Sequence, residues 1–288
     1  MEIEVINIGD ELLLGQTTNT NLTWLGTALY NCGYSINRSV TIKDEANIIS
    51  TALDDACLRS DFVIITGGLG PTQDDITKGT LATYFACELV RNNEVLKHIE
   101  SIFSKKGVEV LEVNKMQADI PDKAEVLSNK LGTAPGMWFT LGRKTCIALP
   151  GVPYEMKYIM ENHVLPRLKA SSTNKRLFHR TVVFTGIGES ALAEHLKDFE
   201  HKVRQAGFAL AYLPSPGIVK VRLSKYQQNS VDTETQLERL TLELQSVVPE
   251  FVLSNKEGAI EVLLGQLLKQ GNYTVCTAES CTGGIVAS

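Results

Sequence analysis

The stretch from residue 62 to residue 77 constrains the fold more than any other part of this 288-residue sequence. It begins with a continuous apolar run, Phe62-Val63-Ile64-Ile65, of the kind that is buried on both faces of a parallel sheet. The run leads directly into Thr66-Gly67-Gly68-Leu69-Gly70-Pro71-Thr72, and a helix is expected from about Asp75. A buried strand, a glycine-rich loop and a helix in this order are typical of the ligand-binding edge of an open α/β sheet.

Strand and helix patterns alternate through the first part of the chain. Residues 2–8 form an apolar, β-branched run, and residues 35–42 alternate like a strand. Apolar residues recur at helical spacing over residues 22–29 and 48–56, and Gly33 ends the first of these helices. Strands that alternate with helices predict an α/β fold with a doubly wound, mostly parallel sheet.

The chain divides into three predicted domains. Residues 137–149 are expected to form a hairpin or edge pair, followed by a turn and a helix that close the first domain, residues 1–169. Residues 170–176 are small and polar, which favours a linker. A small α+β domain is predicted over residues 170–253, and residues 254–288 are too few to close a core. We expect this last segment to be the truncated start of a third α/β domain.

The second and third predicted domains have recognisable elements. In the second we expect strands at residues 177–185, 208–213 and 218–224, helices at 189–199 and 231–246, and a turn at 214–217. In the third we expect an amphipathic helix from about Asn255 and a strand at 273–277.

Composition excludes several functional classes. The net charge is −5 and no basic run is present, so we expect no nucleic-acid partner. No apolar stretch is long enough to span a membrane, and the start lacks a signal-peptide pattern, so we expect a cytoplasmic protein. The six cysteines form no CxxC and the five histidines form no HExxH, which argues against a zinc site.

The glycine-rich loop predicts an anion site. Gly67, Gly68 and Gly70 let the backbone approach an anion, and the following helix offers free N–H groups. No Gly-Lys-Ser/Thr follows at the offset of a Walker A loop. Asp74 and Asp75 place two carboxylates beside this cradle, and carboxylates repel phosphate unless a cation such as Mg²⁺ bridges them. We expect Asp74 and Asp75 to bind metal; the alternative is that one or both cap the helix.

Three other loops are expected to converge on this site. Gly9-Asp10-Glu11 follows the first strand, Asp44 follows the second, and Pro150-Gly151-Val152-Pro153 precedes a helix that contains Glu155. Asp44 alone would be an ordinary N-cap, and the proline turn alone a rigid connection. Lys78 could neutralise developing charge or be an unremarkable surface lysine. The predicted ligand-binding residues are Gly9, Asp10, Glu11, Thr66, Gly67, Gly68, Gly70, Pro71, Thr72, Thr77, Lys78, Pro150, Gly151, Pro153 and Glu155.

Two further motifs have different interpretations. Gly186-Ile187-Gly188-Glu189-Ser190-Ala191 fits the G-x-G-x-x-A pattern of dinucleotide binding, but the next predicted strand ends without an acidic residue, so a turn and helix cap are expected. Ala278-Glu279-Ser280-Cys281-Thr282-Gly283-Gly284 places Ser280 between a predicted strand and a glycine pair, which suits a nucleophile at a helix N-terminus. A base that activates Ser280 would lie beyond residue 288.

Five motifs in order, GDELLLGQTTNTN, TGGLGPTQDDIT, PGVPYEM, GIGES and TAESCTGG, resemble those of CinA, the competence/damage-inducible protein family. By this resemblance, residues 1–169 are similar to the MoaB/Mog-like molybdopterin-binding domain. Residues 170–253 are similar to the family's small α+β connector, and residues 254–288 to the start of its nicotinamide mononucleotide deamidase domain.

The resemblance also implies an activity. It implies hydrolysis of ADP-ribose to AMP and ribose 5-phosphate, in pyridine nucleotide recycling, with potassium and a divalent metal (Mg²⁺ or a transition metal such as Co²⁺) as cofactors. Asp75, followed by Ile76-Thr77, takes the place of an essential aspartate, Asp44 that of a second one, and Ser280 that of the deamidase nucleophile. A homodimer is implied. The alternative is a non-catalytic pterin- or nucleotide-binding scaffold for the deamidase.

Overall fold

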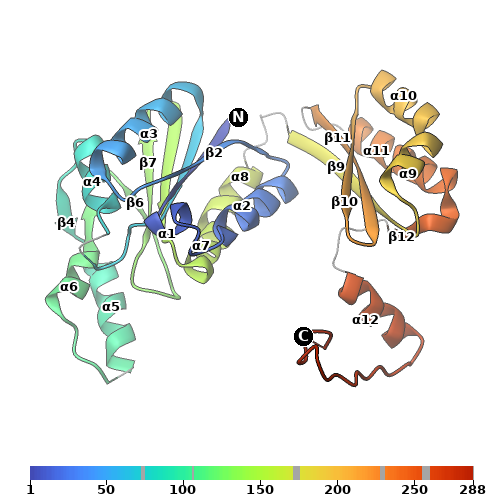
Figure 1. Cartoon of the computed structure of the whole chain (residues 1–288). Coiled ribbons are helices and arrows are strands. Elements are labelled where there is room, and N and C mark those ends of the chain that lie inside the picture. Colours follow the sequence, from blue (N-terminus) through green and yellow to red (C-terminus); the bar gives the residue numbers. More distant parts are fainter. Residues whose placement is uncertain (73–74, 106, 171–175, 228–230, 255–259, 288) are drawn as a thin grey trace. The chain divides into compact units, whose positions relative to one another are not determined.

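The computed structural model describes residues 1–72, 75–105, 107–170, 176–227, 231–254 and 260–287. It contains two compact units, shown in Figure 1. The first comprises Met1–Leu177 with Tyr226–Ser230, and the second comprises Phe178–Lys225 with Val231–Ser288. Within the described residues, no helix is long and apolar enough to cross a membrane.

The first unit is built on a mixed, mostly parallel sheet. Parallel pairing joins the neighbours in β2-β1-β3-β8, and antiparallel pairing adds β7 and β6 at one edge. The predicted doubly wound sheet is therefore confirmed, with a hairpin at its edge. The strands are β1 (Ile3–Ile8), β2 (Ile36–Ile42), β3 (Phe62–Thr66), β6 (Glu125–Leu127), β7 (Gly136–Leu141) and β8 (Lys144–Leu149).

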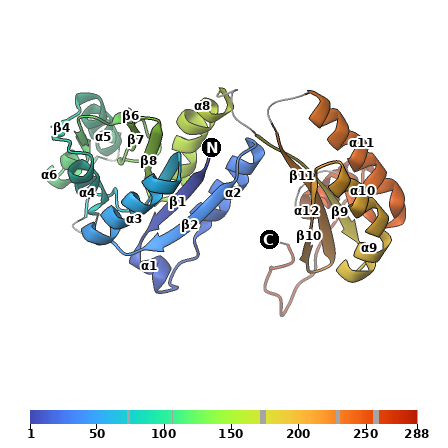
Figure 2. The same cartoon turned by 90° about the horizontal axis from the view of Figure 1, so that it is seen from above.

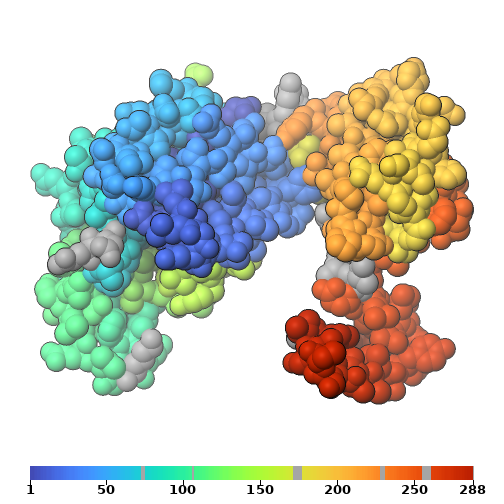
Figure 3. All heavy atoms as spheres, in the orientation of Figure 1, coloured from blue at the N-terminus to red at the C-terminus, as the bar shows by residue number. Residues whose placement is uncertain are grey.

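Helices cover both faces of this sheet. Figure 2 shows α2 (Thr20–Asn31) and α8 (Leu165–Ala170) on one face and α3 (Ala46–Arg59) on the other. Helix α2 also contacts α7 (Pro153–Ile159), and their blue and yellow-green surfaces adjoin in Figure 3. The short helix α1 (Asp10–Leu13) begins just after β1, and α4 (Thr77–Tyr84) begins after the loop that follows β3.

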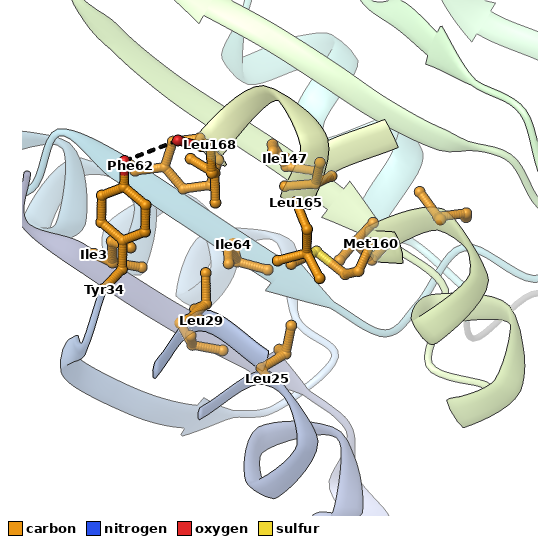
Figure 4. Close-up of a cluster of buried hydrophobic side chains, with 14 of the residues drawn as sticks. Ile3, Leu25, Leu29, Tyr34, Phe62, Ile64, Ile147, Met160, Leu165 and Leu168 are labelled. Carbon is orange, nitrogen blue, oxygen red and sulfur yellow. Dashed lines mark hydrogen bonds between the residues drawn. The ribbon is translucent and has the colours of Figure 1, made fainter. Parts of the chain in front are cut away.

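Because β1 is buried on both faces, its alternate side chains enter two different cores. Ile3 and Val5 face the core beneath α2 and α8, while Ile6 and Ile8 face the core beneath α3 and α4. In the first core the Tyr34 hydroxyl donates a hydrogen bond to the Leu168 carbonyl at 3.0 Å (Figure 4). The continuous apolar runs in the sequence reflect this double burial.

A subdomain between α4 and β6 was not predicted from the sequence. It pairs β4 (Leu89–Arg91) with β5 (Asp119–Pro121) and contains α5 (Asn93–Lys105), α6 (Glu112–Lys115) and the 3₁₀ helix η1 (Met116–Ala118). Its small core includes Val95, Ile99 and Ala118. The spacing of the first two of these residues is the helical signal that could have revealed α5.

The second unit has an antiparallel sheet in the order β10-β11-β9-β12. The helix predicted at residues 189–199 is present but divided into two helices, which are separated at Leu196. Its elements are β9 (Arg176–Thr185), α9 (Glu189–His195), α10 (Lys197–Gln205), β10 (Ala209–Ser215), β11 (Ile218–Gln227), α11 (Val231–Val247), the 3₁₀ helix η3 (Pro249–Phe251) and β12 (Val252–Ser254).

The glycine motif of this unit makes a turn and a helix start, as expected. Gly186 has φ +75° and Gly188 is the N-cap of α9. The predicted turn at residues 214–217 is shorter than expected, because β10 continues to Ser215 and pairs with Ile218 of β11.

The last segment contains one helix, α12 (Ile260–Gln270), and the expected start of this helix near Asn255 lies outside the described residues. The predicted strand at residues 273–277 is wrong, since these residues have no regular secondary structure. A strand needs a hydrogen-bonded neighbour, and no strand of the described residues pairs with this segment.

An ion pair between an exposed arginine and a buried carboxylate predicts how stability depends on that arginine. Glu4 is fully buried on β1, and Arg59 donates from Nε and Nη2 to its carboxylate at 2.9 and 2.8 Å. Arg59 itself is 38% exposed, and Arg38 Nε also lies 3.8 Å from the Glu4 carboxylate. Because the buried carboxylate would lose both of its close charged hydrogen bonds, we expect R59M to lower the free energy of unfolding of the first unit by more than the loss of a surface ion pair does.

Urea unfolding followed by tryptophan fluorescence would measure this change, because both tryptophans, Trp24 and Trp138, pack against the first unit's core. The control is K115M, which removes a surface pair with Glu112 at 3.5 Å and should change stability by less than about 1 kcal/mol. Equal effects of the two substitutions would contradict the prediction.

Candidate functional site

A pocket of about 450 Å³ lies where the loops after β1, β2, β3 and β8 meet. These strands are parallel, so their carboxyl ends share one edge of the sheet. Eleven of the predicted site residues line this pocket: Gly9, Glu11, Asp44, Gly67, Gly68, Gly70, Pro71, Asp75, Pro150, Gly151 and Glu155.

The glycine-rich loop passes so close to its neighbours that two positions exclude a side chain. Gly67 has φ +112°, and a Cβ built on it would lie 2.1 Å from the Ile8 carbonyl oxygen. Gly68 has φ +65°, and its Cβ would lie 2.1 Å from Oγ1 of Thr77. The Gly67 N–H donates to the Leu149 carbonyl at 3.1 Å, which anchors the loop to β8. Glycine is therefore required here by both conformation and space.

Asp75 ties the glycine-rich loop to the start of α4. Its Oδ2 accepts hydrogen bonds from Thr72 N at 3.0 Å and Thr72 Oγ1 at 2.6 Å, whereas Ile76 is the N-cap of the helix. A Cβ on Gly70 would lie 2.5 Å from the same oxygen. Asp75 thus does not cap α4 but faces the loop and the pocket. The other predicted metal ligand, Asp74, lies outside the described residues.

Asp44 brings a second carboxylate to the pocket. Its Oδ2 accepts a hydrogen bond from Asp10 N at 3.3 Å, and the N-cap of α3 is Glu45 rather than Asp44. Burial raises the pKa of Asp44, and the negative charges of Asp10, Glu11 and Asp75 raise it further. The negative charges of carboxylates from three loops therefore repel one another at this pocket.

Glu155 on α7 holds the opposite wall in place. It is only 8% exposed, and burial raises the pKa of its carboxyl group. Its Oε2 accepts a hydrogen bond from Asn129 Nδ2 at 2.5 Å, and the Asn129 Oδ1 accepts from Leu131 N at 3.0 Å. A Cβ on Gly132 would lie 2.0 Å from the same Glu155 oxygen. This packing links α7 to the loop that follows β6.

The turn before α7 forms another part of the wall. A Cβ on Gly151 would lie 3.4 Å from the Cα of Gly67, so the two loops are in direct contact. The Gly151 carbonyl also accepts a hydrogen bond from Asn21 Nδ2 at 2.7 Å. Pro153 and Thr66 line an adjoining cavity of about 100 Å³ rather than the main pocket.

The remaining predicted residues have supporting positions. The Asp10 backbone N–H donates a hydrogen bond to the Asp44 carboxylate, and the Thr72 hydroxyl donates one to the Asp75 carboxylate. Both residues therefore hold a carboxylate that lines the pocket. Thr77 is fully buried, and its Oγ1 has no partner among the described residues. The structure does not bring Lys78 into the main pocket: its Nζ donates to the Met116 carbonyl at 2.6 Å, and burial lowers its pKa.

Ser280 is not part of this pocket. It belongs to the second unit, is exposed, and precedes consecutive turns at residues 281–287 rather than a helix. The predicted strand and helix around this serine are thus both missing. Within the described residues, no hydrogen bond links the Ser280 hydroxyl to a base.

Sequence reasoning missed several residues of the pocket wall, notably Gln117, Thr133 and Ala134. Gln117 is 3% exposed, and its Oε1 has no hydrogen-bond partner in the described part of the chain. These residues follow no strand of the parallel sheet and belong to no glycine motif, so the rule that located the other loops could not find them.

The fold and the site at the strand ends define a class of protein. A family model described as "Probable molybdopterin binding domain" matches residues 4–170, and one described as "Damage-inducible protein CinA KH domain" matches residues 179–253. The first unit is an α/β domain of this molybdopterin-binding class.

Similar proteins narrow this class to one family. The chain is 43% identical over 99% of its length to a "CinA-like protein" of Cytophaga hutchinsonii and covers 68% of that relative. It is 42% identical over 100% of its length to a "CinA-like protein" of Flavobacterium psychrophilum, of which it covers 69%. The crystal structure of CinA from Thermoplasma acidophilum matches with a TM-score of 0.51 and 35% identity, over 56% of this chain and 94% of that one. The chain belongs to the CinA family.

The burial of Glu155 predicts a pH-dependent gain in stability for E155Q. Because its pKa is raised in the folded protein, the folded state retains the proton at a higher pH than the unfolded chain. Stability therefore falls as pH rises from the usual range of a glutamate through the raised pKa. We expect E155Q to be more stable than the original protein at pH 7, with the difference shrinking towards pH 4.

Urea midpoints at both pH values would test this. E161Q is the control, because Glu161 is exposed in the next helical turn and should change stability little at either pH. A destabilised E155Q at pH 7 would show that the ionised carboxylate supports the fold.

Proposed function

We propose that the first unit hydrolyses the diphosphate of ADP-ribose, giving AMP and ribose 5-phosphate, with a divalent cation and potassium as cofactors. The feature that supports this most directly is the meeting of a glycine cradle with the carboxylates of Asp44 and Asp75 in one pocket. The backbone N–H groups of the loop alone would suit an anion, whereas the two carboxylates alone would repel it. Their combination suits a diphosphate that arrives with a cation.

The cradle supplies the contacts for the phosphates. The sharp turn at Gly67 and Gly68 leaves backbone without side chains facing the pocket, and α4 begins directly after this loop. The N-terminus of a helix offers unpaired N–H groups and the positive end of its dipole. We therefore place the diphosphate against this loop, with Pro71 at its outer margin.

The donor set fits a hard divalent cation. Within the described residues, no group of three or more His, Cys, Asp or Glu side chains could hold a metal ion alone. Mg²⁺, however, is commonly held by one or two carboxylates together with waters and substrate phosphates. Asp44 and Asp75 would hold such an ion. Both hydrogen bonds from Thr72 to Asp75 end on Oδ2, so Oδ1 receives no hydrogen bond from the described residues and is the oxygen left for a cation.

In the proposed reaction a water oxygen bonds to one phosphorus while the bridging P–O bond breaks, and the protons of water leave to the phosphate products and solvent. The cation, when bound, neutralises negative charge and polarises the phosphorus. The protein orients the reactants: Thr72 holds Asp75, and Asp10 N–H holds Asp44. The hydrogen bond from Asn129 to Glu155 holds the opposite wall of the pocket in place.

The second unit does not support a nucleic-acid substrate. KH modules clamp a nucleic-acid backbone with a Gly-x-x-Gly loop, and residues 179–253 contain no such sequence. The net charge of −5 also disfavours a polyanion. We therefore propose a small nucleotide as ligand and no nucleic-acid partner.

Replacement of Asp75 tests the proposal. We expect D75N to lower kcat for AMP formation by at least about a hundredfold, because Asn keeps the acceptor for Thr72 but loses the charge. D122N is the matched control, since Asp122 is exposed and also accepts a backbone N–H, that of Glu88 at 3.1 Å.

Chromatography of ADP-ribose incubated with potassium and a panel of divalent cations would measure the product. AMP that forms only with cation, persists in D122N and disappears in D75N is the expected result. Intact ADP-ribose under every cation would favour the alternative, a pterin- or nucleotide-binding module without hydrolysis.

A further inference from the structure

We propose that Cys57 and Cys146 form a reversible disulfide when the protein meets a hydroperoxide, and that this bond fastens α3 to β8. Cys57 lies in the last turn of α3, and Cys146 lies in β8. Both side chains belong to the core beneath α3 and α4, and neither lines the pocket of the candidate site. The disulfide and the proposed hydrolysis can therefore be tested separately.

The two sulfur atoms already lie close to bonding distance. Cys57 Sγ is 3.7 Å from Cys146 Sγ, although the two residues are 89 positions apart in the chain. The S–S bond of a disulfide is about 2 Å long, so the two sulfurs need to approach by less than about 2 Å. An approach of this size is within the reach of side-chain rotation. The fold therefore brings together two thiols that the sequence keeps far apart.

The surroundings of Cys57 favour its ionised form. The hydrogen bond with Cys146 lowers the pKa of Cys57 to about 7, and this effect outweighs that of burial, which raises the pKa. The Tyr84 hydroxyl and the positive charge of Lys144 lower the pKa further, while the negative charge of Asp54 opposes them. Because the thiolate is the reactive form of cysteine, Cys57 is the nucleophile of the pair.

Cys146 is suited to the second role, that of the thiol that completes the disulfide. It is only 1% exposed, and both the hydrogen bond with Cys57 and burial raise its pKa. Cys57 is 9% exposed and precedes Leu58, which is 82% exposed, so a small oxidant reaches the pair from the side of Cys57. The two cysteines therefore have different expected reactivities, which substitution can separate.

The proposed oxidation has two steps. In the first, the Cys57 thiolate bonds to one oxygen of the hydroperoxide, the O–O bond breaks, and the departing oxygen takes a proton to leave as water or an alcohol. In the second, the Cys146 sulfur bonds to the sulfur of the resulting Cys57 sulfenic acid, and the hydroxyl group leaves as water with the Cys146 proton. The two thiols together lose two electrons, and the hydroperoxide gains them.

Cys32 provides a matched control within the same unit. It is 8% exposed, which is close to the exposure of Cys57, but it belongs to the core on the other face of the sheet. Buried cysteines often serve only as small apolar side chains. If Cys57 and Cys146 had that role alone, Cys57 and Cys32 would be equally resistant to an oxidant.

The test treats the folded chain with hydrogen peroxide, using a C276S/C281S variant that lacks two exposed thiols. After an acid quench, the remaining thiols are alkylated in urea, and mass spectrometry of an unreduced digest identifies the linked peptides. We expect a bond between Cys57 and Cys146, with Cys57 losing its free thiol at least about tenfold faster than Cys32. A reductant should restore both thiols, and a chain oxidised in urea should show no preference for this pair.

Single substitutions test the two roles. C146S should leave Cys57 as a sulfenic acid that dimedone labels, whereas C57S should leave Cys146 as an unreacted thiol. The oxidised protein should also unfold at a higher urea concentration than the reduced protein, because the bond closes a loop spanning 89 positions in the unfolded chain. This comparison needs no substitution in the core, so it holds even if C57S or C146S fails to fold.

Other results would overturn the proposal. Cys57 and Cys146 that stay reduced, a bond from either to another cysteine, or equal oxidation of Cys57 and Cys32 would each do so. An oxidised protein that unfolds at the same or a lower urea concentration would show that the bond does not fasten α3 to β8. Hydrolysis of ADP-ribose enters none of these measurements.

Discussion

The contact between the glycine-rich loop and the ends of β1 and α4 is the constraint on which this site depends. The Cβ position of Gly67 is 2.1 Å from the Ile8 carbonyl oxygen, and that of Gly68 is 2.1 Å from Thr77. Any side chain would push the loop away from the sheet edge. The same contact brings Asp75 and Asp44 within electrostatic reach of each other, because each carboxylate sits beside a glycine of this loop.

This arrangement of carboxylates lowers the stability of the folded first unit. Burial and neighbouring negative charges raise the pKa of Asp44, and burial raises that of Glu155, so ionised carboxylates are held where they are least favourable. A protein under selection for stability alone would place neutral groups here. Carboxyl groups with raised pKa values that cluster in one pocket are typical of functional sites. A bound cation with a diphosphate relieves the repulsion, which is why the two are proposed together.

The parallel sheet and its loops could be predicted because local patterns and fold rules agree there. The apolar run of β3 and the glycines after it have few other interpretations, and parallel strands place their carboxyl ends at one edge. The walls at Gln117 and Asn129 could not be predicted, since they depend on how the subdomain between α4 and β6 packs. The strand expected at residues 273–277 failed because a local pattern cannot supply a pairing partner.

The central claim is that the carboxylates of Asp44 and Asp75 require a cation to admit a diphosphate. The most direct measurement is the affinity for ADP-ribose by calorimetry, in Mg²⁺ and in a chelator, for the original protein and the doubly substituted D44N/D75N. The account predicts binding at least about tenfold tighter with Mg²⁺ in the original protein, and little dependence on Mg²⁺ once both charges are removed. Equal binding in Mg²⁺ and chelator by the original protein would contradict it.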